Sequence, residues 1–403
     1  MNTDIKTVKQ MRENKRFVVN QPFTPLDLIS EITNDIAVNS NNSILVFFTI
    51  EWALYLKSIG YTDITVSAND SIVANICKLR GLKYIDTFDL ENSKNMKFDV
   101  IVGNPPFQSD GNNGSHGLWQ KFVALAAERS NNCAVLITPH WHNWAAPTSS
   151  AIGINKKGQV YDRKSGGDYD VFRSGRVKKL VMLPSKKYFD VGSTFCWTMI
   201  VNNGVTSTEV VCEDRSVLHI DFTSSTGLPS VLTPNTFSIY SKLLQFGELR
   251  PFMDHQTINI KKAHYRDTPE PGYEYKWIYS AGKEGVRYRW IAEKSNNYHQ
   301  WKVLIPISAA GNAYKYASVQ TNCNQSQDVS MFLFDCEQDA RMFLKTIQLP
   351  FFNKLLKMNT GTSKHAKLIL PAIDFSRSWS DVELYAHFNL TQAEIDLIEA
   401  TVK

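Results

Sequence analysis

The sequence predicts an α/β fold: a Rossmann-like, doubly wound and mostly parallel sheet, followed by a C-terminal α+β domain. Two observations predict it. Short apolar runs alternate with helical patterns as far as Asn203, which is typical of βαβ units. Beyond that residue the alternation stops, and irregular strands and turns rich in Tyr, Trp and Thr take over. The predicted boundary therefore lies near residue 205, between domains 1–204 and 205–403.

Each element of the first domain has a local reason. The turn in QPFTP precedes an amphipathic helix from about Leu26, and Gly60 and Gly81 each close a helical pattern. The predicted strands are 43–48, 63–70, 82–86, 98–103, 131–139, 177–184 and 194–203, and the helices between the early strands are 51–60, 71–81 and 117–130. In the second domain, helical pattern returns at 336–358 and 390–402.

Composition narrows the class of protein. The 403 residues favour two domains. No apolar run is long enough to span a bilayer, and the polar N-terminus has no signal-peptide core, so we expect a cytoplasmic protein. The six cysteines are scattered without zinc spacing. We therefore expect reduced thiols and no metal site.

One stretch stands out, FDVIVGNPPFQ at 98–108. A buried strand runs directly into two prolines, which remove two backbone donors and fix two φ angles. Pro105 also keeps Asn104 out of the helical region. Asn104 is thus expected in extended geometry at the carboxyl end of a strand, where ligands bind in open α/β sheets. Alone, the turn could equally be structural.

An Asn-Pro-Pro-aromatic turn suits the activation of an exocyclic amine as a nucleophile. The nitrogen lone pair of such an amine is delocalised into the ring. Acceptors around the amine hydrogens, such as the Asn104 side-chain oxygen and the Pro105 carbonyl, draw the nitrogen toward tetrahedral geometry. Phe107 could stack on the ring. Catalysis would then rest on positioning, with no metal. A base inside a duplex would have to be flipped out.

The chain resembles the S-adenosylmethionine-dependent amino methyltransferases, and within them the gamma-class N6-adenine DNA methyltransferases of restriction–modification systems. Asn104-Pro105-Pro106-Phe107 resembles their catalytic motif, and PFTP at 22–25 resembles their N-terminal motif. Softer similarities lie at 137–144, 187–202 and 379–399. The resemblance implies a catalytic domain at 1–204, a target-recognition domain at 205–403 and double-stranded DNA as partner. A separate restriction endonuclease is a candidate second partner.

The resemblance also implies a cofactor site for S-adenosylmethionine. Its candidate residues are Phe23, Thr24, Pro25, Phe48, Thr49, Glu51, Asn69, Asp70, Asp89 and Asn104. Alternatives remain open within this set. Asp70 could bind the ribose or simply cap the next helix, and Asn69 competes with it. Asp86 competes with Asp89, and Thr-Pro also opens helices routinely.

The first cofactor loop departs from the family. That loop is normally glycine-rich, so that backbone can approach the cofactor. Here it reads FFTIEWA, with Phe48 and Ile50 where glycines would stand. We expect a divergent active enzyme, with altered cofactor affinity or pose.

The charge distribution suggests a DNA contact. Residues 156–187 hold ten Lys or Arg and three acids, which indicates either a solvated surface or a phosphate-binding segment beside the catalytic turn. Aromatic residues of 265–301 alternate with cations that include Lys302, as on a DNA-reading surface. His140, Trp141, His142 and Trp144 are further candidates near the base. The candidate DNA contacts are Lys164, Arg173, Arg176, Lys178, Lys179, Phe195, Arg287 and Arg289.

Three functions are compatible with these patterns. The first is site-specific methylation of adenine N6 in DNA. The second is methylation of RNA or of a protein glutamine, although the large C-terminal domain disfavours the glutamine enzyme. The third is a DNA-binding relative that no longer transfers methyl groups.

Overall fold

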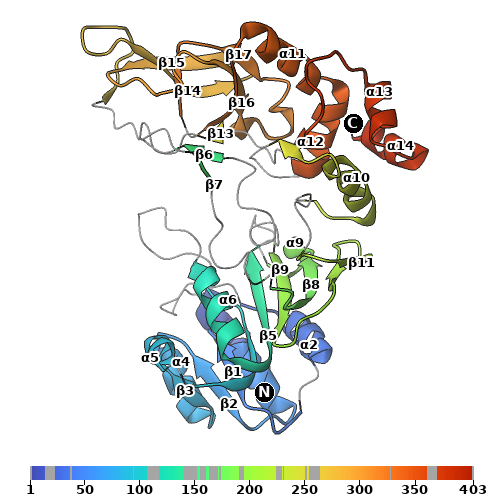
Figure 1. Cartoon of the computed structure of the whole chain (residues 1–403). Coiled ribbons are helices and arrows are strands. Elements are labelled where there is room, and N and C mark those ends of the chain that lie inside the picture. Colours follow the sequence, from blue (N-terminus) through green and yellow to red (C-terminus); the bar gives the residue numbers. More distant parts are fainter. Residues whose placement is uncertain are drawn as a thin grey trace. The chain divides into compact units, whose positions relative to one another are not determined.

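The computed structural model of the chain describes residues 2–13, 23–36, 39–93, 95–106, 118–139, 152–154, 160–162, 171, 174–189, 195–223, 229, 231–249, 252–253, 264–326, 328–360 and 370–401. The chain divides into two compact units. Unit 1 comprises Met1–Ala146 and Ser165–Ser225, and unit 2 comprises Pro147–Lys164 and Thr226–Lys403. Each is described by itself (Figure 1).

Unit 1 is built on a nine-stranded sheet in the order β11-β10-β8-β9-β5-β4-β1-β2-β3 (Figure 1). The strands are β1 Ile44–Phe47, β2 Ile64–Ser67, β3 Lys83–Ile85, β4 Phe98–Gly103, β5 Ser130–Pro139, β8 Val177–Leu183, β9 Phe195–Val201, β10 Thr208–Val211 and β11 Val217–Ile220. Strands β3, β2, β1, β4 and β5 pair in parallel, and β9 runs antiparallel between β5 and β8. The predicted doubly wound, mostly parallel sheet is confirmed.

Helices cover the apolar central strands of this sheet. Every residue of β1 is buried, and α3 and α6 contact the central strands, as expected for a sheet covered on its faces. The helices of unit 1 are α1 Asn2–Glu13, α2 Leu26–Asp35, α3 Ile50–Ser58, α4 Ser71–Leu79, α5 Thr87–Asn92, α6 Leu118–Arg129 and α9 Ser185–Tyr188. None of the described helices in the chain is long and apolar enough to cross a membrane.

Unit 2 is an α+β structure. Its strands are β6 Ile152–Ile154, β7 Val160–Asp162, β12 Glu248–Leu249, β13 Phe252–Met253, β14 Tyr275–Gly282, β15 Gly285–Ile291, β16 Trp301–Pro306, β17 Ser318–Gln320, β18 Asn324–Gln325, β19 Val329–Phe334 and β20 Leu370–Pro371. They form a six-stranded sheet, the three-stranded sheet β15-β14-β18 and the pair β12-β20. The helices are α10 Pro234–Leu244, η2 Ile307–Asn312, α11 Glu337–Ile347, α12 Pro350–Thr360, α13 Asp381–His387 and α14 Gln392–Ala400. The largest core of this unit joins α10, α11 and α12 to β16 and β19.

The structure differs from the sequence expectation in three places. The division between units falls after Ser225 rather than after residue 204, because β10 pairs with β8 and so extends the large sheet. The segment Pro147–Lys164 belongs to unit 2, because β6 pairs with β13. The helical pattern of 336–358 is also split, since Pro350 begins α12.

Candidate active site

The site lies where the strand order reverses. From β1 the chain continues to β2 and β3 on one side, and it returns to β4 and β5 on the other. Such a topological switch point is where open α/β sheets bind ligands. Phe47, the last residue of β1, pairs with Gly103, the last residue of β4. The turn that begins at Asn104 therefore emerges beside the loop after β1.

Asn104 is held at this point from a distant part of the chain. Its side chain is 2% exposed, and Pro105 and Pro106 are buried with it. The Nδ2 atom of Asn104 donates to the Oγ1 atom of Thr24 over 3.3 Å. The backbone N–H of Thr24 in turn donates to Oε1 of Glu51 over 3.0 Å. Three predicted site residues are thus brought into one buried network, which we call the Asn104 network.

Gly103 explains how the two strands come so close. A Cβ atom built there would lie 2.6 Å from the Phe47 carbonyl oxygen and 2.7 Å from the Phe47 Cβ. No side chain fits that space without moving β1 from β4. The position was not among the predicted site residues, although a glycine at the end of a strand beside a candidate turn signals close backbone approach.

The glycine-free loop after β1 keeps one backbone feature of a glycine loop. Phe48 has a φ of 58°, in the left-handed region that disfavours side chains. Its ring is buried and meets the Phe122 ring edge-on, with centroids 4.9 Å apart. Its N–H donates to the Ser67 carbonyl over 2.9 Å, and the Thr49 hydroxyl donates to the Phe47 carbonyl over 2.9 Å. Packing thus anchors a backbone shape that glycine would adopt freely.

The ends of β2 and β3 lie beside each other. Asp70 caps α4, because its Oδ1 atom accepts from the N–H groups of Ile72 and Val73 at 2.8 and 3.4 Å. The capping alternative is therefore observed, while ribose binding stays a prediction. Asn69 accepts from the Thr87 N–H over 3.0 Å, which ties the two turns together.

The turn after β3 presents an aromatic ring and carboxylates. Asp86 caps α5 by accepting from the Phe88 N–H over 2.9 Å. Asp89, in the first turn of α5, is exposed, and Phe88 beside it is 67% exposed. Burial raises the pKa of Tyr84, so its phenol stays protonated and donates to the Ala68 carbonyl.

The remaining N-terminal candidates flank Thr24. Phe23 and Pro25 are half-buried, and Pro25 is the residue immediately before α2. Phe107, the last member of the predicted catalytic turn, lies outside the described residues. So do Lys164, Arg173 and the four aromatic or histidine candidates of 140–144.

The basic candidates on β8 lie away from the turn. Strand β8 is antiparallel to β9, which is antiparallel to β5, so β8 runs in the same direction as β4. Three basic candidates precede or begin β8: Arg176, Lys178 and Lys179. They therefore lie at the amino ends of the parallel strands, whereas the turn lies at the carboxyl ends. The expectation that they lie beside the catalytic turn is wrong.

Two of these cations also have structural partners. Lys179 pairs with Asp35 and Glu209, each over 3.0 Å. Arg176 donates to the carbonyls of Val201 and Ala127 over 3.0 and 2.7 Å. Lys178 is exposed.

Phe195 is placed differently. It begins β9 opposite Pro139, at the carboxyl end of β5, and so lies on the same edge as the turn. Its ring is 4% exposed and packs against Phe189 at a centroid distance of 5.0 Å.

The candidate cations of unit 2, Arg287 and Arg289, lie on β15, and Arg289 packs against aromatic rings. The Arg289 guanidinium lies over the rings of Tyr265 and Tyr279, 4.0 and 4.6 Å from their centroids, and Asp267 accepts from it over 3.1 Å. Arg287 is exposed and pairs with Glu284 over 2.6 Å.

Lys302 is not a surface residue, and its inclusion among surface cations is wrong. It is fully buried, and its Nζ atom donates to the carbonyls of Asn297, Tyr298 and Cys323. Burial lowers the pKa of Lys302 to about 8. Its long stem lets the ammonium reach backbone acceptors inside the fold, which alternation with aromatics cannot reveal.

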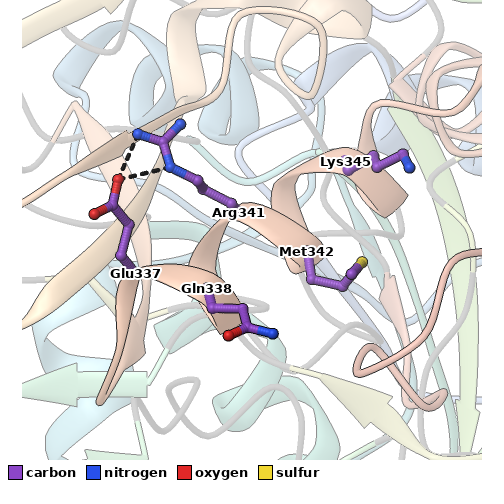
Figure 2. Close-up of a pocket in the computed structure, with 5 residues that line it drawn as sticks. All are labelled: Glu337, Gln338, Arg341, Met342 and Lys345. Atoms are coloured by element: carbon purple, nitrogen blue, oxygen red, sulfur yellow. Dashed lines mark hydrogen bonds and ion pairs between the residues drawn. The ribbon is translucent and has the colours of Figure 1, made fainter.

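A surface pocket occurs in unit 2, on α11. Figure 2 shows its lining residues on this one helix, with Glu337 paired to Arg341 and with Met342 and Lys345 further along. The pocket is open and contains none of the predicted site residues. We place the candidate active site at the strand ends instead, because the Asn104 network and the close approach of β1 and β4 occur there.

A family model matches part of the chain. Residues 37–148 match a family model described as Eco57I restriction-modification methylase. This segment is similar to restriction–modification methylases, and we call it the methylase segment. The methylase segment runs from the residues before β1 to beyond β5, so it contains both strands of the switch point and the Asn104 turn. No curated protein matches the chain.

Several solved structures are similar. A type I restriction-modification methyltransferase subunit from Streptococcus thermophilus is 12% identical, with 47% of each chain covered and a TM-score of 0.35. The M protein of the type I restriction enzyme EcoKI is 15% identical over 47% of this chain and 48% of that chain, with a TM-score of 0.35. The type IIG restriction endonuclease BpuSI is 11% identical over 93% of this chain and 59% of that chain, with a TM-score of 0.38. The chain thus spans about half the length of the two type I proteins.

Proposed function

We propose that the protein is a DNA methyltransferase that transfers a methyl group from S-adenosylmethionine to N6 of an adenine flipped out of the duplex. One observation carries this proposal. The Asn-Pro-Pro turn begins at the switch point of the sheet, inside the methylase segment, and its asparagine is buried and hydrogen-bonded to Thr24.

The turn supplies what an unreactive amine needs. The Asn104 Oδ1 atom and the Pro105 carbonyl accept from the two amine hydrogens. This draws the nitrogen lone pair out of conjugation with the ring. Both acceptors are fixed before the substrate arrives, so no reorganisation is required at the moment of transfer. Phe107 and Phe195 are the proposed stacking partners of the base.

The residues at the ends of β1, β2 and β3 fit S-adenosylmethionine, which supplies an electrophilic methyl group when bound. Asn69 and Asp70 stand beside the turn of Phe88 and Asp89, so polar groups for a ribose adjoin an exposed ring and a carboxylate for an adenine. Phe23, Pro25, Thr49 and Glu51 are the proposed wall toward the methionine end. The left-handed Phe48 keeps the loop after β1 in a glycine-like shape.

Double-stranded DNA is the proposed partner, and unit 2 is the proposed target-recognition domain. The assignment of unit 2 is supported by the aromatic rings and charged groups around Arg287 and Arg289. Lys164 and Arg173 stay proposed phosphate contacts. A separate restriction endonuclease is the proposed second partner. The gamma-class order of motifs is likewise part of this proposal.

Transfer of a tritiated methyl group tests the function. The protein is incubated with labelled S-adenosylmethionine and unmethylated duplex DNA of diverse sequence, and the product is digested to nucleosides. We expect the label in N6-methyl-2′-deoxyadenosine. A parallel reaction contains RNA, and label in the RNA but not in the DNA supports the RNA enzyme instead. DNA binding without any transfer supports the non-catalytic relative.

A matched variant assigns the reaction to the turn. Asn104→Ala removes one acceptor, and loss of one such group typically lowers the rate by about two to three decades. We expect that loss in single-turnover methylation, with a melting curve showing a folded variant. Transfer within threefold of wild type by a folded Asn104→Ala protein would place the chemistry elsewhere.

A further inference from the structure

The hydroxyl of Thr24 is the described partner of the Asn104 side-chain nitrogen. The two residues are 80 positions apart in the chain, and they are 0% and 2% exposed. The bond joins Nδ2 to Oγ1 at 3.3 Å. A buried bond between segments this distant needs a reason beyond local folding.

Thr24 is itself held in place by its backbone. Its N–H donates to Oε1 of Glu51 over 3.0 Å, and Glu51 is fully buried in the first turn of α3. The amino end of a helix favours a negative charge there. The backbone of Thr24 is therefore held in place, with its hydroxyl beside the Asn104 amide.

The orientation of that amide decides what Asn104 presents. An asparagine side chain carries one acceptor atom and one donor group, which exchange places when the amide flips. An amine that donates two hydrogens needs the oxygen toward it. With the amide reversed, two donors would face each other in a buried site, and the buried amine would lack an acceptor.

We propose that Thr24 is a positioning residue for the transfer: its hydroxyl accepts from Nδ2 and so anchors the side-chain amide of Asn104 while the Oδ1 atom faces the substrate amine. The proposal rests on the proposed function and names the residue that prepares the same site. Thr24 then affects the rate of methyl transfer and not the affinity for the cofactor.

Three variants separate this task from a general structural one. Thr24→Val keeps the shape of the side chain and removes the hydroxyl, whereas Thr24→Ser keeps the hydroxyl. Thr33→Val is the matched control, because Thr33 is a buried threonine of α2 whose hydroxyl donates to Ile29 and accepts from Trp52, not from Asn104.

The first measurement does not depend on activity. The side-chain amide of Asn104 is observed by NMR in protein labelled with ¹⁵N only at asparagine, and it is assigned by its absence from Asn104→Ala. In Thr24→Val we expect its signals to shift and its protons to exchange faster with water. Thr24→Ser and Thr33→Val should leave the signals close to those of wild type. Unchanged Asn104 signals in Thr24→Val would overturn the proposal.

The second measurement splits rate from binding. In single-turnover methylation at saturating cofactor, Thr24→Val should be slower by about tenfold to a hundredfold, the range caused by a misplaced catalytic group. Thr24→Ser and Thr33→Val should stay within about threefold of wild type. Calorimetry with S-adenosylhomocysteine should give Thr24→Val an affinity within threefold of wild type.

The outcomes are distinguishable. A Thr24→Val protein that loses cofactor affinity but transfers at the normal rate when saturated makes Thr24 a cofactor contact and overturns the proposal. If wild-type protein transfers no methyl group to adenine, the proposed function fails. The NMR comparison still decides whether Thr24 orients Asn104.

Discussion

At the scale of single residues, Phe48 is where the chain departs most from a glycine-rich cofactor loop. Its backbone adopts a left-handed φ of 58°, and a non-glycine residue there costs about 1–2 kcal/mol. The buried ring between Phe47 and Phe122 compensates for that cost. The loop therefore has bulky side chains in place of glycines but keeps a glycine-like backbone turn.

Two truncations of Phe48 separate the contribution of the ring from that of the backbone. Phe48→Gly and Phe48→Ala both lose the ring, so both should be less stable than wild type. Only glycine escapes the left-handed strain, so Phe48→Gly should be more stable than Phe48→Ala by about 1 kcal/mol. Urea unfolding of the two variants measures the difference. An alanine variant as stable as the glycine variant contradicts the strained backbone.

At the scale of elements, strand pairing builds the site. β1 and β4 end in register at Phe47 and Gly103, and this register places the Asn104 turn beside the loop after β1. The adjoining turns of β2 and β3 are joined by the bond from the Thr87 N–H to Asn69. The candidate cofactor residues thus come from strand ends that the sheet itself aligns.

Gly103→Ala tests whether this close approach matters. The added methyl group would meet the Phe47 backbone oxygen at 2.6 Å, so the strands must separate. Overpacking of this kind costs about 1–3 kcal/mol, and we expect that loss of stability together with slower methylation. Gly204→Ala is the control, because Gly204 is exposed and an added Cβ atom there would lie 3.9 Å from its nearest neighbour, the Gly175 carbonyl oxygen. Equal unfolding midpoints for the two variants would contradict the argument.

At the scale of the whole molecule, the sequence predicted the sheet better than it predicted the site. Contiguous apolar runs such as 98–103 identify buried strands, and the prolines after them locate the turn. Strands β10 and β11, at one side of the sheet, were missed because their partly exposed segments, TEVV and VLHI, lack that signal. The contact between Thr24 and Asn104 was missed for another reason. It joins segments that only the folded sheet brings together, and no spacing rule reveals it.

In unit 2, the buried carboxylate of Glu394 joins two helices. Its carboxylate accepts from Lys242 Nζ, Ser238 Oγ and the Thr391 N–H, each over 2.7 Å. It thereby ties α14 to α10. Burial alone would raise the pKa of Glu394, but these hydrogen bonds lower it to about 2. The ionised form is therefore favoured by folding.

A carboxyl group whose pKa is lower in the folded state stabilises the fold above its unfolded pKa, here about 4.5. That stability is lost as the pH falls from 4.5 through 2. Glu394→Gln removes the charge at every pH, so it should be less stable than wild type at pH 7, and the gap should narrow toward pH 3. Thermal unfolding followed by tryptophan fluorescence, at steps between pH 7 and pH 3, measures the gap. A gap that stays constant across this range would mean that the bridge between α10 and α14 does not depend on the charge of Glu394.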